Sequence, residues 1–196
     1  MTYTRDERSM HERLLAGDPY IADDPVLEEL SLAARDLAAA YNATSDRQRP
    51  MRRRLLEQLL GSVGEDTQIR TPLHVDYGSH ITIGSHCFVN VGLMALDVAP
   101  ITIGDHVQIG PNVQLLTPTH PLEAGPRRDG WESAEPITLG DNVWLGGGVI
   151  VCPGVTIGAN TVVGAGSVVT KDLPADVVAV GNPARVIKPL PPSDAA

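Results

Sequence analysis

The chain has 196 residues, enough for one domain with a sizeable core. Aromatic residues make up only 4% of the sequence, whereas it contains 19 glycines and 16 prolines, a composition typical of a narrow fold with many turns. The formal net charge of −9 argues against partners such as nucleic acid or an anionic membrane surface.

The two cysteines, Cys87 and Cys152, show neither the spacing of a metal site nor a disulfide framework. The N-terminus is charged and contains acidic residues, so it does not resemble a signal peptide. No apolar run of about 18 residues predicts a membrane span. We therefore expect a cytoplasmic protein with no membrane partner.

Residues 1–61 have helical character. A first short helix is predicted over residues 5–16, and Asp24 with Pro25 is a capping pair for a second. The apolar residues spaced at three and four in this second helix are Val26, Leu30, Ala33, Leu37 and Ala40. A third helix is predicted from near Asp46 to Gly61. We interpret its basic run as a solvated face: Arg47, Arg49, Arg52, Arg53 and Arg54.

Residues 81–172 repeat with a period of six, as in ITIGSH (81–86), ITIGDH (101–106) and VTIGAN (155–160). This period fits neither a helix nor a freely running strand, but it fits a chain winding in three short strands per coil. The fold class is therefore predicted as mainly β, a left-handed parallel β-helix of hexapeptide repeats. The large aliphatic residues expected to point inward are Ile83, Ile103, Ile109, Leu139, Leu145, Val151, Ile157, Val163 and Val169.

Residues 119–136 interrupt the repeat. If they are removed, VQLLTP (113–118) continues directly into ITLGDN (137–142), so this 18-residue loop is expected to leave and rejoin the coil at one corner. A loop of this length without secondary structure of its own is usually functional. The predicted organisation is a helical segment over 1–61, the β-helix over 62–175 with the loop at 119–136, and a tail over 176–196 that packs on the β-helix.

Histidines are the candidate catalytic or metal-binding residues. His86 and His106 occupy the same place in successive repeats and should stack about 4.8 Å apart, but no third ligand shares their register, so we expect exposed corners rather than a metal site. His120 stands at the base of the protruding loop between Pro118 and Pro121. A histidine held there could act as a general base near neutral pH, with an ordinary loop residue as the alternative.

The chain resembles the maltose/galactoside O-acetyltransferase family of hexapeptide-repeat acyltransferases. The resemblance rests on RLLAGDPY (13–20), YNAT (41–44), THPL (119–122), ITLGDNVWLGGGVIVCPGVTIG (137–158) and GNPARVI (181–187). It implies an acetyl-CoA-dependent O-acetyltransferase that moves an acetyl group directly to a hydroxyl of a sugar or similar small acceptor. It also implies a homotrimer with its sites between subunits and no requirement for a metal.

The resemblance implies roles for individual residues. His120 matches the catalytic base. Positions on the acceptor side match Asn90, Asp97, Asp76, Tyr77 and Glu132. Positions lining the cofactor groove match Trp144, Gly147, Ala165, Thr170, Lys171 and Arg185. The charge pattern agrees in one respect, because Lys171, Arg185 and Lys188 place basic charge near the end of an otherwise acidic chain.

Two other functions remain open from the sequence. A metal-dependent enzyme of the γ-carbonic-anhydrase type uses a related coil, but it would need further histidines after His120, and there are none. A non-catalytic trimeric scaffold would have no use for a protruding loop that carries a histidine. Cys152, as an acyl-carrying nucleophile, has no activating base in register and is interpreted as a small packed side chain.

Overall fold

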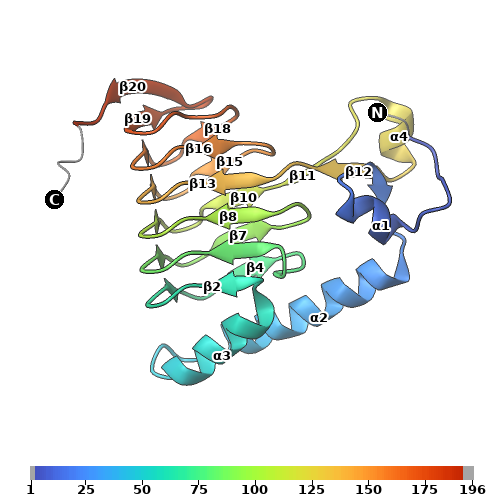
Figure 1. Ribbon diagram of the computed structural model, residues 1–196, viewed down its shortest axis with the longest axis horizontal. Helices are drawn as coiled ribbons and strands as arrows, with labels where there is room; N and C mark the ends of the chain where they lie inside the picture. The colour runs from blue at the N-terminus through green and yellow to red at the C-terminus, as the bar shows by residue number, and fades with distance from the viewer. Residues whose placement is uncertain (1–2, 192–196) are drawn as a thin grey trace.

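The computed structural model describes residues 3–191; the last residues of the predicted tail, 192–196, lie outside this range. The chain winds into a coil with three flat faces, each a stack of short strands (Figure 1). The first face contains β2 (Ser62–Val63), β5 (Ile81–Ile83), β8 (Ile101–Ile103), β13 (Ile137–Leu139) and β16 (Thr156–Ile157). The second contains β4 (Leu73–Val75), β7 (Leu93–Leu96), β10 (Gln114–Leu116), β15 (Ile150–Val151) and β18 (Val168–Val169).

The third face, called here the seven-stranded face, carries most of the exposed residues discussed below. It contains β3 (Gln68–Ile69), β6 (Phe88–Val89), β9 (Gln108–Ile109), β14 (Trp144–Leu145), β17 (Val162–Val163), β19 (Val177–Val180) and β20 (Arg185–Pro189). Strands on all three faces pair in parallel, except that β20 folds back antiparallel onto β19. The predicted mainly-β coil of hexapeptide repeats is confirmed.

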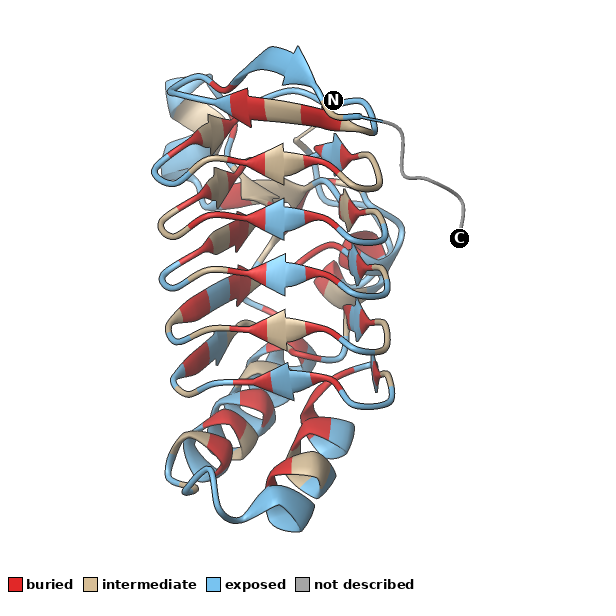
Figure 2. Cartoon of the chain, turned by 90° about the vertical axis from the view of Figure 1, so that its left-hand side faces the viewer, coloured by how far each residue is buried: buried red, intermediate tan, exposed pale blue. Residues whose placement is uncertain are grey.

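The core is a single column of aliphatic side chains along the inside of the coil. All nine residues predicted to point inward are buried, and Figure 2 shows buried and exposed residues alternating around each coil. Aliphatic residues on successive coils stack, as Ile83 does on Ile103 and Ile103 on Leu139. Most hexads bury a second side chain besides the predicted one, as Ile101 does beside Ile103 on β8, and together these residues fill the interior.

The helices α2 and α3 cover the N-terminal end of the coil (Figure 1). The helix α1 (Met10–Leu15) starts later than predicted, because Ser9 and Glu12 form a capping box at its N-terminus. The helix α2 (Pro25–Asn42) begins as predicted, with the Asp24 side chain accepting a hydrogen bond from the Val26 N–H. The helix α3 spans Arg49–Leu59.

The predicted inward face of α2 was wrong by one position. Leu27 is buried, whereas Val26 and Leu30 are 50% and 43% exposed. The two ends of α2 pack against different partners: Leu27 joins a small apolar cluster with Trp131, and Tyr41 joins the main core. Those tertiary contacts decide which of two adjacent apolar stripes faces inward.

Arg52 also departs from the prediction of a solvated basic face, since it is only 8% exposed. Its guanidinium group donates to the Tyr41 hydroxyl at 2.9 Å and to the Ile69 carbonyl at 2.6 Å. It also donates to the Thr44 hydroxyl at 2.9 Å. Arg52 therefore joins α2, α3 and the first coil, and these hydrogen bonds make its burial tolerable.

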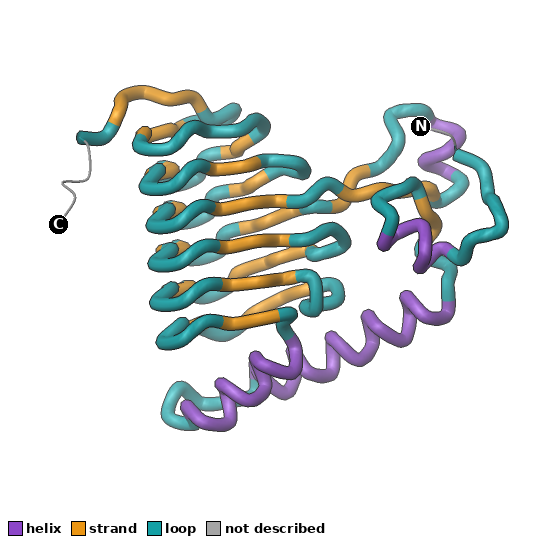
Figure 3. The backbone as a smooth tube through the Cα atoms, viewed as in Figure 1, coloured by secondary structure: helices purple, strands orange, loops and turns teal. Residues whose placement is uncertain are grey.

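Residues 119–136 leave the coil and return to the same corner, as expected, and Figure 3 shows them projecting from it. The Glu135 N–H donates to the Thr117 carbonyl at 3.0 Å where the ends meet. The expectation that this loop lacks secondary structure was wrong. The strand β11 (Pro118–Thr119) leads into the loop, and α4 (Ala124–Arg128) and β12 (Trp131–Ala134) lie within it.

The projecting segment is ordered because it packs on the N-terminus. The strand β12 pairs antiparallel with β1 (Tyr20–Ile21), and Trp131 is buried with Met10, Leu14 and Tyr20. We call residues 119–136 the excursion from here on.

Within residues 3–191, no helix combines the length and the apolar character needed to cross a membrane.

Candidate functional site

A groove of about 500 Å³ runs across the middle coils of the seven-stranded face. Trp144 stands at its centre on β14, between Gln108 on β9 and Val162 on β17. The Trp144 side chain is 54% exposed. A large aromatic side chain left open to solvent in a chain with few aromatic residues is a natural contact for a ligand.

The floor of this groove is backbone rather than side chain. A Cβ on Gly110 would lie 2.6 Å from the Gly147 nitrogen, and one on Gly146 would lie 2.6 Å from the Ala165 nitrogen. Successive coils therefore approach too closely for any residue but glycine at these two positions. Gly110 and Gly146 therefore allow the coils to pack closely, and they leave backbone lining this part of the groove.

The structure brings four of the predicted site residues together in this groove. Three of them, Trp144, Gly147 and Ala165, were predicted on the cofactor side, and Asn90 on the acceptor side. The remaining predicted cofactor residues do not line the groove; Thr170, Lys171 and Arg185 are exposed near the C-terminal end of the coil. The Asn90 side-chain oxygen accepts a hydrogen bond from the Val91 N–H at 2.9 Å.

His120 lies on the excursion, outside the groove that holds Trp144; of the other predicted site residues, Glu132 is also on the excursion. It is exposed, and within residues 3–191 no hydrogen bond or ion pair involves its side chain. Arg127 holds the turn that follows it, donating to the Pro121 carbonyl at 2.7 Å and the Leu122 carbonyl at 2.8 Å. The imidazole is thus available to a ligand while the backbone beside it is fixed.

The other acceptor-side residues gather at the base of the excursion around Asp97. This carboxylate is fully buried and accepts hydrogen bonds from the N–H groups of Asp76 at 3.0 Å and Tyr77 at 2.9 Å. It also accepts from the His80 N–H at 3.2 Å. With its oxygens used in this way, Asp97 fixes the backbone of the Asp76–His80 turn.

Asp76 and Glu132 make this region strongly acidic. Burial, together with the charges of Asp97 and Glu132, raises the pKa of Asp76 to about 6. Burial and the Asp76 charge raise the pKa of Tyr77 to about 12. Tyr20 lies opposite Glu132 in the β1–β12 pair, and burial raises its pKa as well. The partly buried side chains of Asp76, Tyr77 and Glu132 can exchange hydrogen bonds with a polyhydroxylated ligand, whereas Tyr20 is fully buried.

Sequence reasoning missed Phe88 and Gln108, which line the groove beside Trp144. Their signal was present, because both occupy the same position in their hexads as Trp144 and Val162. It also missed Tyr20. No sequence pattern brings that residue next to Glu132; only the packing of the excursion on the N-terminus does.

His86 and His106 stack as predicted, with ring centroids 5.0 Å apart, at corners where both residues have positive φ. Among residues 3–191, no group of three or more histidine, cysteine or acidic residues could hold a metal ion. Burial raises the pKa of the Cys152 thiol, which disfavours the thiolate that a nucleophile requires.

Comparison with known proteins identifies the family to which this architecture belongs. Two family models match, the maltose acetyltransferase hexapeptide capping motif over residues 13–64 and the bacterial transferase hexapeptide (six repeats) over residues 136–171. The galactoside O-acetyltransferase of Escherichia coli (strain K12) is 40% identical over 181 residues, covering 92% of this chain and 89% of the relative.

Solved structures agree. A maltose O-acetyltransferase from Clostridium difficile 630 superposes with a TM-score of 0.92 at 44% identity, covering 95% of this chain and 100% of that one. A galactoside acetyltransferase in complex with coenzyme A gives a TM-score of 0.91 at 39% identity, covering 94% and 92%. The chain therefore belongs to the maltose/galactoside O-acetyltransferase family of hexapeptide-repeat acyltransferases.

Proposed function

We propose that this protein is an acetyl-CoA-dependent O-acetyltransferase that acts on a hydroxyl of a sugar or a related small acceptor. The observation that carries the proposal is the groove beside Trp144, with its glycine floor, in a chain that is 39% identical to a galactoside acetyltransferase solved with coenzyme A. A pantetheine arm is long and narrow, and it would lie along the floor formed at Gly110 and Gly146. Lys171 and Arg185 would then supply positive charge for the phosphates of the cofactor.

His120 acts as the general base in this proposal. Its imidazole takes the proton from the acceptor hydroxyl while the hydroxyl oxygen attacks the thioester carbonyl. The tetrahedral intermediate places negative charge on the carbonyl oxygen, which backbone N–H groups stabilise. The carbon–sulfur bond then breaks, the acetyl group stays on the acceptor oxygen, and the CoA thiolate leaves and accepts a proton.

The reaction needs residues from two subunits. In Figure 1 the excursion projects on the right, whereas β19 and β20, the last strands of the seven-stranded face, lie on the left. His120 and Trp144 of one chain therefore serve different sites, and we propose that His120 faces the Trp144 groove of a neighbour in a homotrimer. A closed threefold ring built from one heterologous contact forms three such sites.

The acceptor is bound between Asn90 of one subunit and the acidic region at the base of the excursion of the next subunit. Asp76, Tyr77 and Glu132 are partly buried and can hydrogen-bond to sugar hydroxyls. Asp97 acts through the backbone of the turn that it holds, so it orients Asp76 and Tyr77 rather than contacting the acceptor itself.

An acetyl-CoA turnover assay with detection of the free thiol tests this function on a panel of hydroxyl acceptors. We expect thiol release that depends on the acceptor, with the acetyl group recovered as an ester. Release at the rate of acceptor-free hydrolysis across mono- and disaccharides and other small alcohols would contradict the proposal.

A further inference from the structure

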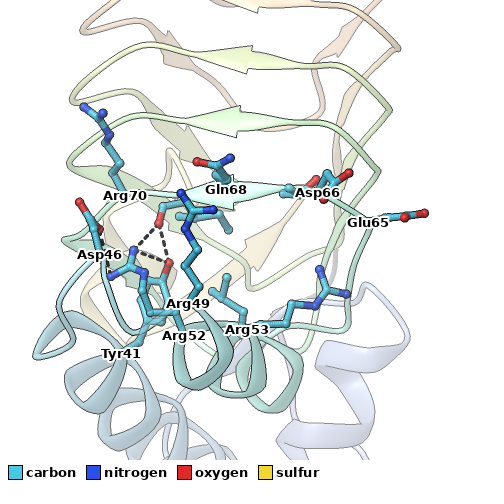
Figure 4. Close-up of a pocket in the computed structure, with 12 residues that line it drawn as sticks. Tyr41, Asp46, Arg49, Arg52, Arg53, Glu65, Asp66, Gln68 and Arg70 are labelled. Carbon is cyan, nitrogen blue, oxygen red and sulfur yellow. Dashed lines mark hydrogen bonds and ion pairs between the residues drawn. The ribbon is translucent and has the colours of Figure 1, made fainter.

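A cavity of about 660 Å³ lies between α3 and the first coil, at the helical end of the seven-stranded face (Figure 4). Four arginines line it: Arg49, Arg52, Arg53 and Arg70. The whole chain contains only 15 basic residues and has a net charge of −9, so four arginines at one cavity are a local concentration of positive charge. Three carboxylates line the cavity as well, Asp46, Glu65 and Asp66, so its formal charge is +1 in a chain whose net charge is −9.

Two of these arginines serve the fold. Arg52 donates to Tyr41 and Ile69, as described above. Arg53 pairs with Glu57 at 2.7 Å and donates to the Gly64 carbonyl at 2.7 Å. Their hydrogen-bonding capacity is largely used within the protein.

Arg49 and Arg70 differ from them. Within residues 3–191, neither guanidinium group donates a hydrogen bond to the protein or forms an ion pair. In Figure 4 the Arg49 side chain rises from α3 across β3, beside Gln68, while Glu65 and Asp66 lie towards the other end of the cavity. Arg49 therefore offers unused donors inside the cavity, and Arg70 offers them at its edge, where its side chain points towards the next coil.

Asp46, one of the carboxylates that line the cavity, is paired with another arginine. Asp46 lines the cavity on the same side in Figure 4, but it lies 3.5 Å from the buried Arg52 and balances that charge. A guanidinium fork binds a carboxylate or a phosphate through two parallel hydrogen bonds. The complementary ligand group is therefore a carboxylate or a phosphate.

The cavity adjoins the groove of the proposed active site. Gln68 on β3 pairs with Phe88 on β6, and Phe88 lines the groove. The Arg70 guanidinium carbon lies 5.3 Å from the centroid of the Phe88 ring. Along the seven-stranded face, Trp144 on β14 comes first, Asn90 follows at the end of β6, and Arg70 lies one coil beyond.

We propose that Arg49 and Arg70 bind a carboxylate or phosphate group carried by the acceptor, so that this enzyme prefers acidic saccharides to neutral ones. The inference rests on the proposed acetyl transfer, because it takes Asn90 as the acceptor end of the groove. An acceptor whose reacting hydroxyl lies beside Asn90, next to the cofactor arm over Gly110 and Gly146, has its far end one coil away, at Arg70. The anionic group takes no part in the chemical step; it fixes the orientation of the acceptor.

The test compares glucuronic acid and glucose 6-phosphate with glucose as acceptors at constant ionic strength. We expect kcat/KM for the acidic acceptors to exceed that for glucose. This ratio should fall about tenfold in Arg49→Gln and in Arg70→Gln, as the loss of one charge-assisted hydrogen bond predicts. Arg54→Gln is the matched control, because Arg54 is exposed on α3 and does not line the cavity, so its ratio should equal that of the wild type.

A binding measurement separates this inference from the proposed function. Calorimetric titration of the full-length protein with glucuronate should give binding that weakens in Arg70→Gln and persists in Arg54→Gln. If no sugar is acetylated but this binding pattern holds, the proposed function fails and the anion site stands. Acidic-to-neutral ratios that are equal in the wild type and the cavity variants, or inorganic phosphate binding without glucuronate binding, would overturn the assignment to the acceptor.

Discussion

At the scale of single residues, His120 combines an unused imidazole with a backbone that the protein holds still. We predict that His120→Ala lowers turnover by about 10²–10⁴-fold, because a positioned general base contributes that much. Coenzyme A binding should stay near the wild-type level, since the groove beside Trp144 does not include His120. Steady-state kinetics and equilibrium binding of coenzyme A measure the two effects. Turnover equal to that of the wild type would remove His120 from the mechanism.

Asp76 is a partly buried carboxylate whose ionised form lowers the stability of the fold. Its pKa is raised from 3.8 to about 6, so the folded chain holds the proton more tightly than the unfolded chain does. The free energy of unfolding therefore falls as the pH rises from about 4 to about 6. Asp76→Asn has no such proton to lose. We therefore predict that its free energy of unfolding rises relative to that of the wild type across this interval, by less than about 3 kcal/mol, and that the difference in Tm grows with it.

Thermal unfolding of Asp76→Asn and the wild type at a series of pH values checks this difference. Asp36→Asn is a suitable control, because Asp36 is exposed on α2. Parallel pH profiles for the wild type and Asp76→Asn would show that Asp76 titrates normally in the folded chain. A gain in stability with a loss of acceptor affinity would mark Asp76 as a residue kept for binding.

At the scale of elements, Arg52 is the connection between the helical end and the coil. Arg52→Met removes the donors that satisfy the buried Ile69 carbonyl and Tyr41 hydroxyl. We predict a loss of about 2–4 kcal/mol in the free energy of unfolding. The same change at Arg54, which is exposed on α3, should cost less than about 0.5 kcal/mol. Denaturant unfolding of both variants gives the comparison, and equal losses would contradict this role for Arg52.

How well the sequence predicted each element depended on how local its determinants are. In the coil, one hexad fixes which residue points inward, so Ile103 and Leu139 were placed correctly without knowledge of anything distant. In α2 the helical period left two adjacent stripes, and contacts of Leu27 with the excursion chose between them. Arg52 was misplaced for a related reason, since its partner Ile69 lies in a strand outside the helices.

The residues of the candidate site also divide into those placed by the local repeat and those placed by contacts with distant parts of the chain. Asn90, Trp144, Gly147 and Ala165 meet because hexads in register bring them to one face, so matching their positions in the sequence sufficed. The excursion has no repeat, and its order comes from packing Trp131 against the N-terminus. No pattern within residues 119–136 predicts that they pack on the N-terminal segment, so β12 was not expected.

At the scale of the whole molecule, the excursion and the seven-stranded face point away from one another, so the proposed active site requires an assembly. Mixed trimers test this directly. His120→Ala subunits retain the Trp144 groove, and Trp144→Ala subunits retain the imidazole. In a trimer that contains both kinds, one of the three contacts joins an intact imidazole to an intact groove.

We therefore predict that co-expressing differently tagged His120→Ala and Trp144→Ala subunits restores about one quarter of the wild-type activity, the fraction of intact contacts in random trimers at equal abundance. Each variant expressed alone should remain nearly inactive. Trimers purified through both tags should be more active per site than the unselected mixture, because every one of them contains an intact contact. If the doubly tagged trimers are no more active than either variant alone, the imidazole and the groove that work together belong to the same chain.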